Sequence, residues 1–373
     1  MLTAAVRDLK RALGAAVAVD VRTPCPALWE NSPHLTPLAD GAAGAEEIAC
    51  GYPLIHRSNT GPWHFIHGFT QFLAKTLGVA VPPTEFKGDI HLSPEEKAWM
   101  PQVQEVTGMR VPYWIVGAGG KYDFTAKWWA HGRWQAVVER FAGRILFVQV
   151  GEAGHHHPAL RGVLDLRGRT TLRQLVRLVH HAQGVLCPVT LLMHLAAAVE
   201  VGPGMPRNRP CVVVAGGREP AQWEAYPHHQ YLHTNGALRC CDHGGCWKAR
   251  VVPLGDGDKK DEARNLCVDV VEMATGRRQR GEAWGREREN AQRSTSNAQR
   301  STEGAAEPFT NHSSPITTTD FLPRCMEMIS AEDVMRRIEL YFDGGAVRYL
   351  TDREWQACEE TIPELGRQSV CMA

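Results

Sequence analysis

The sequence has no long apolar segment and no net charge, and both absences limit what the protein can be. Its longest apolar run, residues 185–199, is interrupted by Pro188 and His194, whereas a membrane span needs about 20 apolar residues. The 41 Lys and Arg residues balance the 41 Asp and Glu residues, so no overall basic field attracts nucleic acid. We therefore predict no membrane span and no nucleic-acid partner.

The first residues also lack the order of a secretory signal, which places charge before an apolar core. Arg7, Lys10 and Arg11 lie inside the apolar stretch at residues 1–19. This arrangement indicates a cytoplasmic protein.

In a reducing compartment, clustered cysteines suggest a metal site before they suggest disulfides. Five of the eleven cysteines gather between residues 240 and 325: Cys240, Cys241, Cys246, Cys267 and Cys325.

From residue 111 onward, short apolar segments alternate with amphipathic ones. Strands are expected at residues 111–116, 144–150, 163–166, 185–187 and 211–214, and helices at residues 128–141, 171–183 and 191–199. This alternation predicts an α/β protein, with a parallel sheet covered by helices on both faces. Ahead of it we expect a helix at residues 2–13, a buried strand at 15–21 and a helix at 63–77.

Residues suited to a nucleotide diphosphate follow four of these strands, at the end where parallel sheets bind ligands. Glycine amides and helix N-termini attract phosphate, a lysine adds charge, and a carboxylate can bind ribose hydroxyls. The candidates are Thr125, Lys127, Glu152, Thr190, His194, Gly216 and Gly217. Each signal alone also fits an ordinary turn, and His194 also fits a histidine packed on an apolar helix.

A series of segments resembles the donor half of glycosyltransferase family 9, the ADP-heptose heptosyltransferases. The segments are residues 123–129 (DFTAKWW), 147–152 (FVQVGE), 165–170 (DLRGRT), 193–198 (MHLAAA) and 215–223 (AGGREPAQW). The resemblance implies a GT-B fold, in which two Rossmann-like domains face each other across a cleft. It also implies that the C-terminal domain holds the nucleotide.

The resemblance assigns roles to individual residues. Lys127 matches the lysine that contacts donor phosphate, and Glu152 matches the acid that holds the ribose. Thr190 and His194 match the Asp-Thr-Gly-x-x-His turn of the family. Val189 and Leu191 stand where that turn has aspartate and glycine, so its usual sugar and phosphate contacts are altered.

The N-terminal region departs further, because the family begins with a strand and a Gly-Asp turn whose aspartate is the general base. Residues 1–7 resemble the helix after that turn, so we expect an N-terminal domain without its first strand. The catalytic residue is then unknown. Asp20, His56 and His64 are the available substitutes, since an inverting transferase needs a base near the acceptor hydroxyl.

Four segments follow from these patterns. Residues 1–110 form the truncated acceptor-side domain, and residues 111–272 form the donor domain with the cysteine loop. Residues 273–319 form a disordered insertion, because this polar stretch contains the tandem copy NAQRST and few aliphatic residues. Residues 320–373 complete the cysteine loop and add C-terminal helices.

The cysteine loop predicts a structural ion. Cys240, Cys241 and Cys246 flank a glycine turn, and tetrahedral thiolate sites suit zinc or iron. The loop resembles the four-cysteine iron finger of the bacterial autotransporter heptosyltransferases, a protein-modifying branch of the family. We select Cys241, Cys246, Cys267 and Cys325 as ligands, with buried free thiols as the alternative.

The combined hypothesis is an inverting glycosyltransferase that carries a heptose-type sugar from a nucleotide diphosphate to a protein or glycan hydroxyl. A catalytically degenerate, metal-stapled scaffold that binds nucleotide or protein is the alternative. A nucleotide-sugar epimerase is disfavoured, because neither Tyr-x-x-x-Lys nor Gly-x-Gly-x-x-Gly occurs. Acceptor identity stays open, as does assembly, with a homo-oligomer among the options.

Overall fold

The computed structural model describes residues 1–273, 276, 278–280 and 320–366. The side chains of His56, residues 278–280 and Glu364 are outside this description. Most of the disordered insertion predicted for residues 273–319 therefore lies outside the described residues. Among the described residues, no helix combines the length and apolarity needed to cross a membrane.

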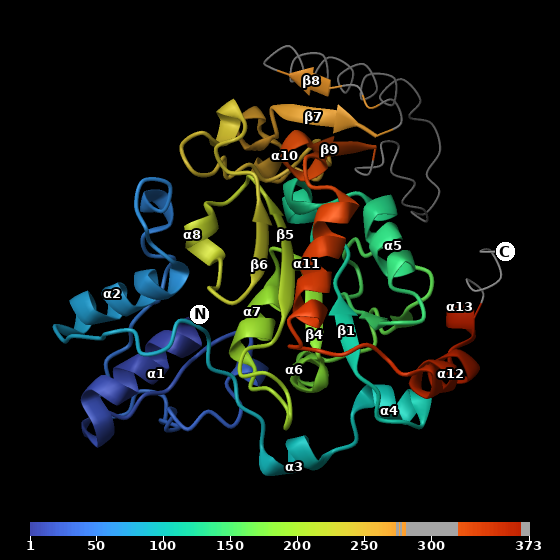
Figure 1. Cartoon of the computed structure of the whole chain (residues 1–373). Helices are drawn as coiled ribbons and strands as arrows, with labels where there is room; N and C mark the ends of the chain where they lie inside the picture. The colour runs from blue at the N-terminus through green and yellow to red at the C-terminus, as the bar shows by residue number, and fades with distance from the viewer. Residues whose placement is uncertain (274–275, 277, 281–319, 367–373) are drawn as a thin grey trace, which may run out of the picture.

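Six parallel strands form the central sheet, in the order β3-β2-β1-β4-β5-β6 (Figure 1). They are β1 (Tyr113–Val116), β2 (Leu146–Gln149), β3 (Leu164–Asp165), β4 (Gly184–Pro188), β5 (Cys211–Gly216) and β6 (Gln230–His233). Every residue of β1, β2, β4 and β5 is buried, as expected for a parallel sheet covered on both faces. The strand order reverses between β1 and β4, and open parallel sheets bind ligands outside the strand ends at such a reversal.

Helices cover both faces of this sheet, because successive strand residues point to opposite sides. Ile115 belongs to the apolar layer beneath α6 and α7, and its neighbour Trp114 belongs to the layer beneath α5 and α11. The covering helices are α5 (His131–Arg140), α6 (Leu172–His181), α7 (Leu191–Ala198) and α11 (Ala331–Asp343). The predicted α/β class is therefore confirmed.

Two helices begin at a capping box, in which side chains bond the free backbone amides of the first turn. The Gln174 N–H donates to Thr171 Oγ1 at 3.2 Å, and the Thr171 N–H donates to Gln174 Oε1 at 2.8 Å. This reciprocal pair satisfies amide groups that a helix start leaves unpaired. Ser330 and Asp333 make the same reciprocal pair at the start of α11.

The N-terminal region differs from its prediction. Its helices α1 (Leu2–Leu13) and α2 (Phe65–Leu77) pack together through Leu9 and Phe69. The strand predicted at residues 15–21 is wrong. Residues 14–16 form a short 3₁₀ turn, and the extended chain that follows joins no sheet. Its alternating valines fit a strand, but none of the described strands lies beside them to complete a ladder.

Among the described residues before β1, the one β-type pairing is a bridge between Ile90 and Val199. Two short helices, α3 (Pro94–Ala98) and α4 (Gln102–Thr107), then lead into the sheet. The described chain thus contains one of the two parallel sheets that the resemblance implies.

A small antiparallel sheet lies beyond the carboxyl end of β5 in Figure 1, where α10 contacts both β5 and β7. Its strands have the order β8-β7-β9. The elements of this region are β7 (Asp269–Glu272), β8 (Arg278–Arg280), β9 (Phe321–Pro323) and α10 (Arg324–Glu327). Three further helices are α8 (Ala221–Glu224), α12 (Asp352–Thr361) and α13 (Pro363–Gly366).

Candidate functional site

Lys127 lies at the strand-order reversal of the central sheet. It ends a 3₁₀ segment, Tyr122–Lys127, that follows β1. Its Nζ donates to the Val189 carbonyl, just beyond β4, at 3.4 Å. The same Nζ lies 2.8 Å from Glu219 Oε1, just beyond β5, and 19% of the Lys127 side chain is exposed. Lys127 therefore contacts the chain just beyond two neighbouring strands, β4 and β5.

Glu219 is a buried carboxylate shared by two cations. Arg218 forms a second ion pair with its Oε1 atom. Burial opposes ionisation of Glu219, but Lys127 and Arg218 outweigh it and lower the pKa of this carboxyl below its ordinary value. The Phe124 ring lies under both cations, 5.6 Å from Lys127 Nζ and 4.7 Å from Arg218 Cζ. The cluster carries two positive charges and one negative charge.

His194 lies beside this cluster, on α7. Its Nδ1 is 3.1 Å from the Tyr226 hydroxyl, and its Nε2 is 3.9 Å from Glu224 Oε2. Burial lowers the pKa of His194 well below its ordinary value, so the ring is neutral at pH 7. These polar neighbours distinguish it from a histidine packed only among apolar side chains.

Glu224 is a member of the site that the sequence analysis missed. It ends the short helix α8, and its carboxyl is buried. Burial first, and then the charge of Glu219, raise the pKa of Glu224 to about 8. The carboxyl is therefore mostly protonated at neutral pH. No sequence signal identified it, because a glutamate at the end of a short polar segment ordinarily faces solvent.

The three substitutes for a general base behave differently. His64 caps α2, with its Nδ1 accepting the Ile66 N–H at 3.1 Å, and burial lowers the pKa of its ring to about 3. Such a ring is a weak proton acceptor at neutral pH. Asp20 accepts hydrogen bonds from the backbone of Val21 and Leu38. The His56 side chain lies outside the described residues.

Two donor-binding candidates already have structural partners. The Thr125 hydroxyl is buried and accepts the Val251 N–H at 2.9 Å. The Thr190 hydroxyl lies 3.4 Å from the Pro188 carbonyl. Glu152, by contrast, has a side chain that is 73% exposed, with His155 Nδ1 at 3.3 Å. The structure therefore brings Lys127, Thr190 and His194 near one strand-end cluster and leaves Glu152 open to solvent beyond β2.

The glycine turn after β1 is less available than the sequence indicates. The Gly117 N–H donates to the Leu186 carbonyl at 2.9 Å, and the Gly120 N–H donates to the His156 carbonyl at 2.9 Å. Gly119 has φ +108°, and a Cβ there would lie 2.0 Å from the His156 carbonyl oxygen. The turn is thus bonded to the loop after β2.

An apolar cavity of about 220 Å³ opens beside this turn. Trp128 and His156 stack against each other on its wall, with ring centroids 4.0 Å apart. Burial lowers the pKa of His156 to about 4, so this wall is uncharged at neutral pH. A planar apolar group is the kind of ligand that such a wall accommodates.

The five clustered cysteines do meet in space, around the turn after β5. A Cβ on Gly217 would lie 3.0 Å from Cys241 Sγ and 3.3 Å from Cys325 Cβ. Gly216 and Gly217 therefore pack against the cysteines. The proximity of Cys246 and Cys240 adds to burial in raising the pKa of Cys325 to about 12.

Each of these cysteines is a free thiol. Cys241 Sγ donates to the Thr234 and Leu238 carbonyls, and Cys267 Sγ donates to the Asp269 carbonyl. Within the described residues, no three of the sulfur atoms lie within 4.8 Å of one another, although a tetrahedral zinc site with Zn–S of about 2.3 Å needs sulfur atoms about 3.8 Å apart. Four thiols are a donor set that suits zinc or iron.

Residues 56–232 match the model of glycosyltransferase family 9 (heptosyltransferase). A family 9 structure from Veillonella parvula is 17% identical, with a TM-score of 0.36, and the match covers 47% of this chain and 50% of that chain. ADP-heptose LPS heptosyltransferase II of E. coli is 18% identical, with a TM-score of 0.34 and coverage of 46% and 53%.

The iron-containing dodecameric glycosyltransferase TibC from enterotoxigenic E. coli is 19% identical, with a TM-score of 0.32 and coverage of 44% and 39%. The chain thus matches 53% or less of the length of these three structures. No curated protein matches the sequence. The resemblance predicted from the sequence is confirmed: residues 56–232 match glycosyltransferase family 9, the heptosyltransferases.

Proposed function

We propose that this protein is a glycosyltransferase that moves a heptose-type sugar from ADP-heptose to a protein or glycan hydroxyl, with inversion. The carrying observation is Lys127, a cation that touches the chain beyond β4 and β5 at the reversal of strand order. Ligands of open parallel sheets bind at this place. The family match over residues 56–232 supports the class of donor.

In this proposal, Lys127 and Arg218 bind the diphosphate of the donor. Glu219 already pairs with both cations, so the incoming phosphate competes with a carboxylate for them. Neutral His194 and protonated Glu224 offer hydrogen bonds to the donor without adding negative charge. Both groups therefore suit a site that must accept an anion.

The remaining donor-binding residues divide into contact and positioning roles. Glu152, with its exposed carboxylate, binds the ribose hydroxyls, and Thr190, the residue before α7, contacts the donor from the start of that helix. Thr125 positions the Val251 loop through its buried hydroxyl. Gly216 and Gly217 allow the cysteine loop to approach β5 closely.

Calorimetry with ADP and ADP-heptose tests the role of Lys127. Lys127→Ala removes one charge-assisted hydrogen bond worth about 1.5–3 kcal/mol, which weakens binding about 10- to 150-fold. Lys121→Ala is the matched control, because Lys121 is an exposed lysine of the same turn. Equal dissociation constants for Lys127→Ala and the wild type would remove the proposed phosphate contact.

Release of ADP tests the transfer itself. The wild type is mixed with ADP-heptose and with candidate acceptors that carry serine, threonine or sugar hydroxyls, and ADP is measured together with the mass of the acceptor. An acceptor that gains one heptose supports transfer. Binding of donor with no transfer to any acceptor would overturn the enzyme proposal.

That outcome would favour the alternative, a degenerate scaffold that binds nucleotide or protein. One observation supports it: the Gly117 and Gly120 amides already donate to backbone carbonyls, so fewer phosphate donors remain at this turn. The scaffold would still bind ADP, and would release none from ADP-heptose.

We also propose that Cys241, Cys246, Cys267 and Cys325 hold a structural iron or zinc ion, with Cys240 as a spare ligand. When bound, the ion would replace the thiol protons and link the cysteine loop to the chain at β7 and α10. Four thiolates leave no open coordination position, so catalysis is not assigned to this ion.

A further inference from the structure

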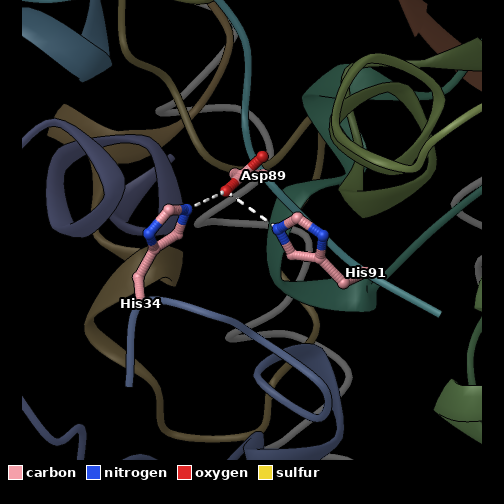
Figure 2. A group of neighbouring side chains, drawn as sticks. All are labelled: His34, Asp89 and His91. Atoms are coloured by element: carbon pink, nitrogen blue, oxygen red, sulfur yellow. Dashed lines mark hydrogen bonds and ion pairs between the residues drawn. The ribbon is translucent and has the colours of Figure 1, made fainter. Parts of the chain in front are cut away.

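Three residues outside the candidate donor site form a group that neither the proposed function nor the cysteines explain. They are His34, Asp89 and His91, shown in Figure 2. His34 Nε2 lies 2.9 Å from Asp89 Oδ2, and His91 Nε2 lies 3.0 Å from the same oxygen. One ligand atom from each residue lies within 4.8 Å of the other two.

We propose that His34, Asp89 and His91 bind a single zinc ion through His34 Nε2, His91 Nε2 and an Asp89 carboxylate oxygen. Two imidazoles and one carboxylate are a donor set that zinc accepts, with a fourth position left to water. At metal–ligand distances of about 2.0–2.1 Å, neighbouring ligand atoms of a tetrahedral site are about 3.3–3.4 Å apart. The two His–Asp separations need to open by a few tenths of an ångström, and the two imidazole nitrogens already lie within 4.8 Å of each other.

The backbone beside two of the three ligands, Asp89 and His91, is held by hydrogen bonds. The Asp89 N–H donates to Thr3 Oγ1 at 3.0 Å, and the next amide, Ile90 N–H, donates to the Ala198 carbonyl at 3.1 Å. The His91 carbonyl accepts from Arg173 at 2.6 Å. Two of the three ligands are thus fixed before any ion binds, which reduces the ordering cost of binding.

The surroundings leave room for an ion and for solvent. The exposed fractions of the His34, Asp89 and His91 side chains are 19%, 21% and 30%, so a water can reach the fourth position. Arg7 lies 3.9 Å from the other Asp89 oxygen, and it also pairs with Asp8 at 3.0 Å. The Asp8 carboxylate therefore offsets the positive charge of Arg7, which would otherwise disfavour a bound cation.

An ion here would join two segments that are far apart in the sequence. His34 belongs to the loop after α1, whereas Asp89 and His91 flank the residue that bridges to Val199. The ion would tie the N-terminal loop to the chain that adjoins the central sheet. This site shares no ligand with the cysteine cluster.

Zinc and cobalt titrations of the full chain, freed of metal with a chelator, test the proposal. We expect His34→Ala/His91→Ala to bind one zinc fewer per chain than the wild type in calorimetry. His131→Ala/His233→Ala, which removes two exposed histidines elsewhere, should keep the wild-type stoichiometry. Asp89→Asn, which preserves size and hydrogen bonding, should weaken this zinc at least about tenfold.

Cobalt distinguishes the two proposed sites, because thiolate ligands give an intense ultraviolet charge-transfer band that imidazole and carboxylate lack. The His34→Ala/His91→Ala protein should keep any thiolate band and bind one cobalt fewer per chain. Cys241→Ser/Cys267→Ser should lose that band and keep the visible absorption of cobalt bound by His34, Asp89 and His91. Circular dichroism checks that each variant folds. Unchanged zinc stoichiometry in folded His34→Ala/His91→Ala, or unchanged affinity in Asp89→Asn, would overturn the proposal.

Discussion

Glu224 gives the site a stability signature that depends on pH. The pKa of this carboxyl is raised from 4.5 to about 8, so the folded protein holds a proton that the unfolded chain loses. Its contribution to stability is therefore fully present below about pH 4.5 and is lost as the pH rises toward 8. Glu224→Gln keeps the shape and hydrogen-bonding capacity of the protonated acid and cannot ionise.

The size of the effect follows from the shift, at 1.36 kcal/mol per pKa unit. Relative to the wild type, Glu224→Gln should gain about 1 kcal/mol in free energy of unfolding at pH 5 and about 4 kcal/mol at pH 8. Urea denaturation at several pH values measures this difference directly. Effects of His64 and His194 cancel, because both proteins contain them.

Glu105→Gln, on an exposed glutamate of α4, is the matched control and should follow the wild-type pH profile. Parallel pH profiles for Glu224→Gln and the wild type would refute the reasoning. They would mean that Glu224 ionises as readily in the folded protein as in the unfolded chain.

Three further perturbations have defined outcomes. Gly119→Ala should lower the free energy of unfolding, measured by urea denaturation, by at least about 2 kcal/mol, because the new Cβ would clash with the His156 carbonyl at a positive φ. Gly132→Ala is the control and should not lower it, because no atom lies within 4 Å of the new Cβ. Arg173→Ala should cost about 3 kcal/mol in the same assay by leaving the Glu96 carboxylate, whose side chain is 8% exposed, without its partner; an unchanged midpoint would contradict this. Cys241→Ser/Cys267→Ser should lower bound iron or zinc by about one ion per chain in elemental analysis, whereas Cys50→Ser, on an exposed thiol, should retain the wild-type content.

The central sheet could be predicted from sequence because its strands are buried on both faces. A continuous apolar run such as β5 is stable only when it is buried on both sides, as in the middle of a parallel sheet. The reciprocal hydrogen bonds of Thr171 and Gln174 mark the start of α6. The extended residues after α1 carry a similar pattern. Their state depends on whether a partner strand lies alongside, which a local pattern does not contain.

Some residues of the candidate site could likewise be predicted from the sequence, and others could not. Lys127 could be identified because it follows a strand and a glycine turn, and such positions meet at one edge of a parallel sheet. Glu224 and the Glu219 ion pairs could not, since their importance comes from burial by distant segments. The grouping of His34 with Asp89 also depends on packing, because 55 residues separate them in sequence.

The pairing of Lys127 with Glu219 makes anion binding an exchange reaction. A phosphate that binds Lys127 as proposed would replace this resting counter-ion, and the displaced carboxylate would stay beside Arg218. A singly charged anion therefore gains little binding free energy by replacing the Glu219 carboxylate, whereas a diphosphate can bind both Lys127 and Arg218 at once. Because the Glu219 carboxylate competes for the same cations, a ligand must carry more negative charge than this carboxylate to bind tightly.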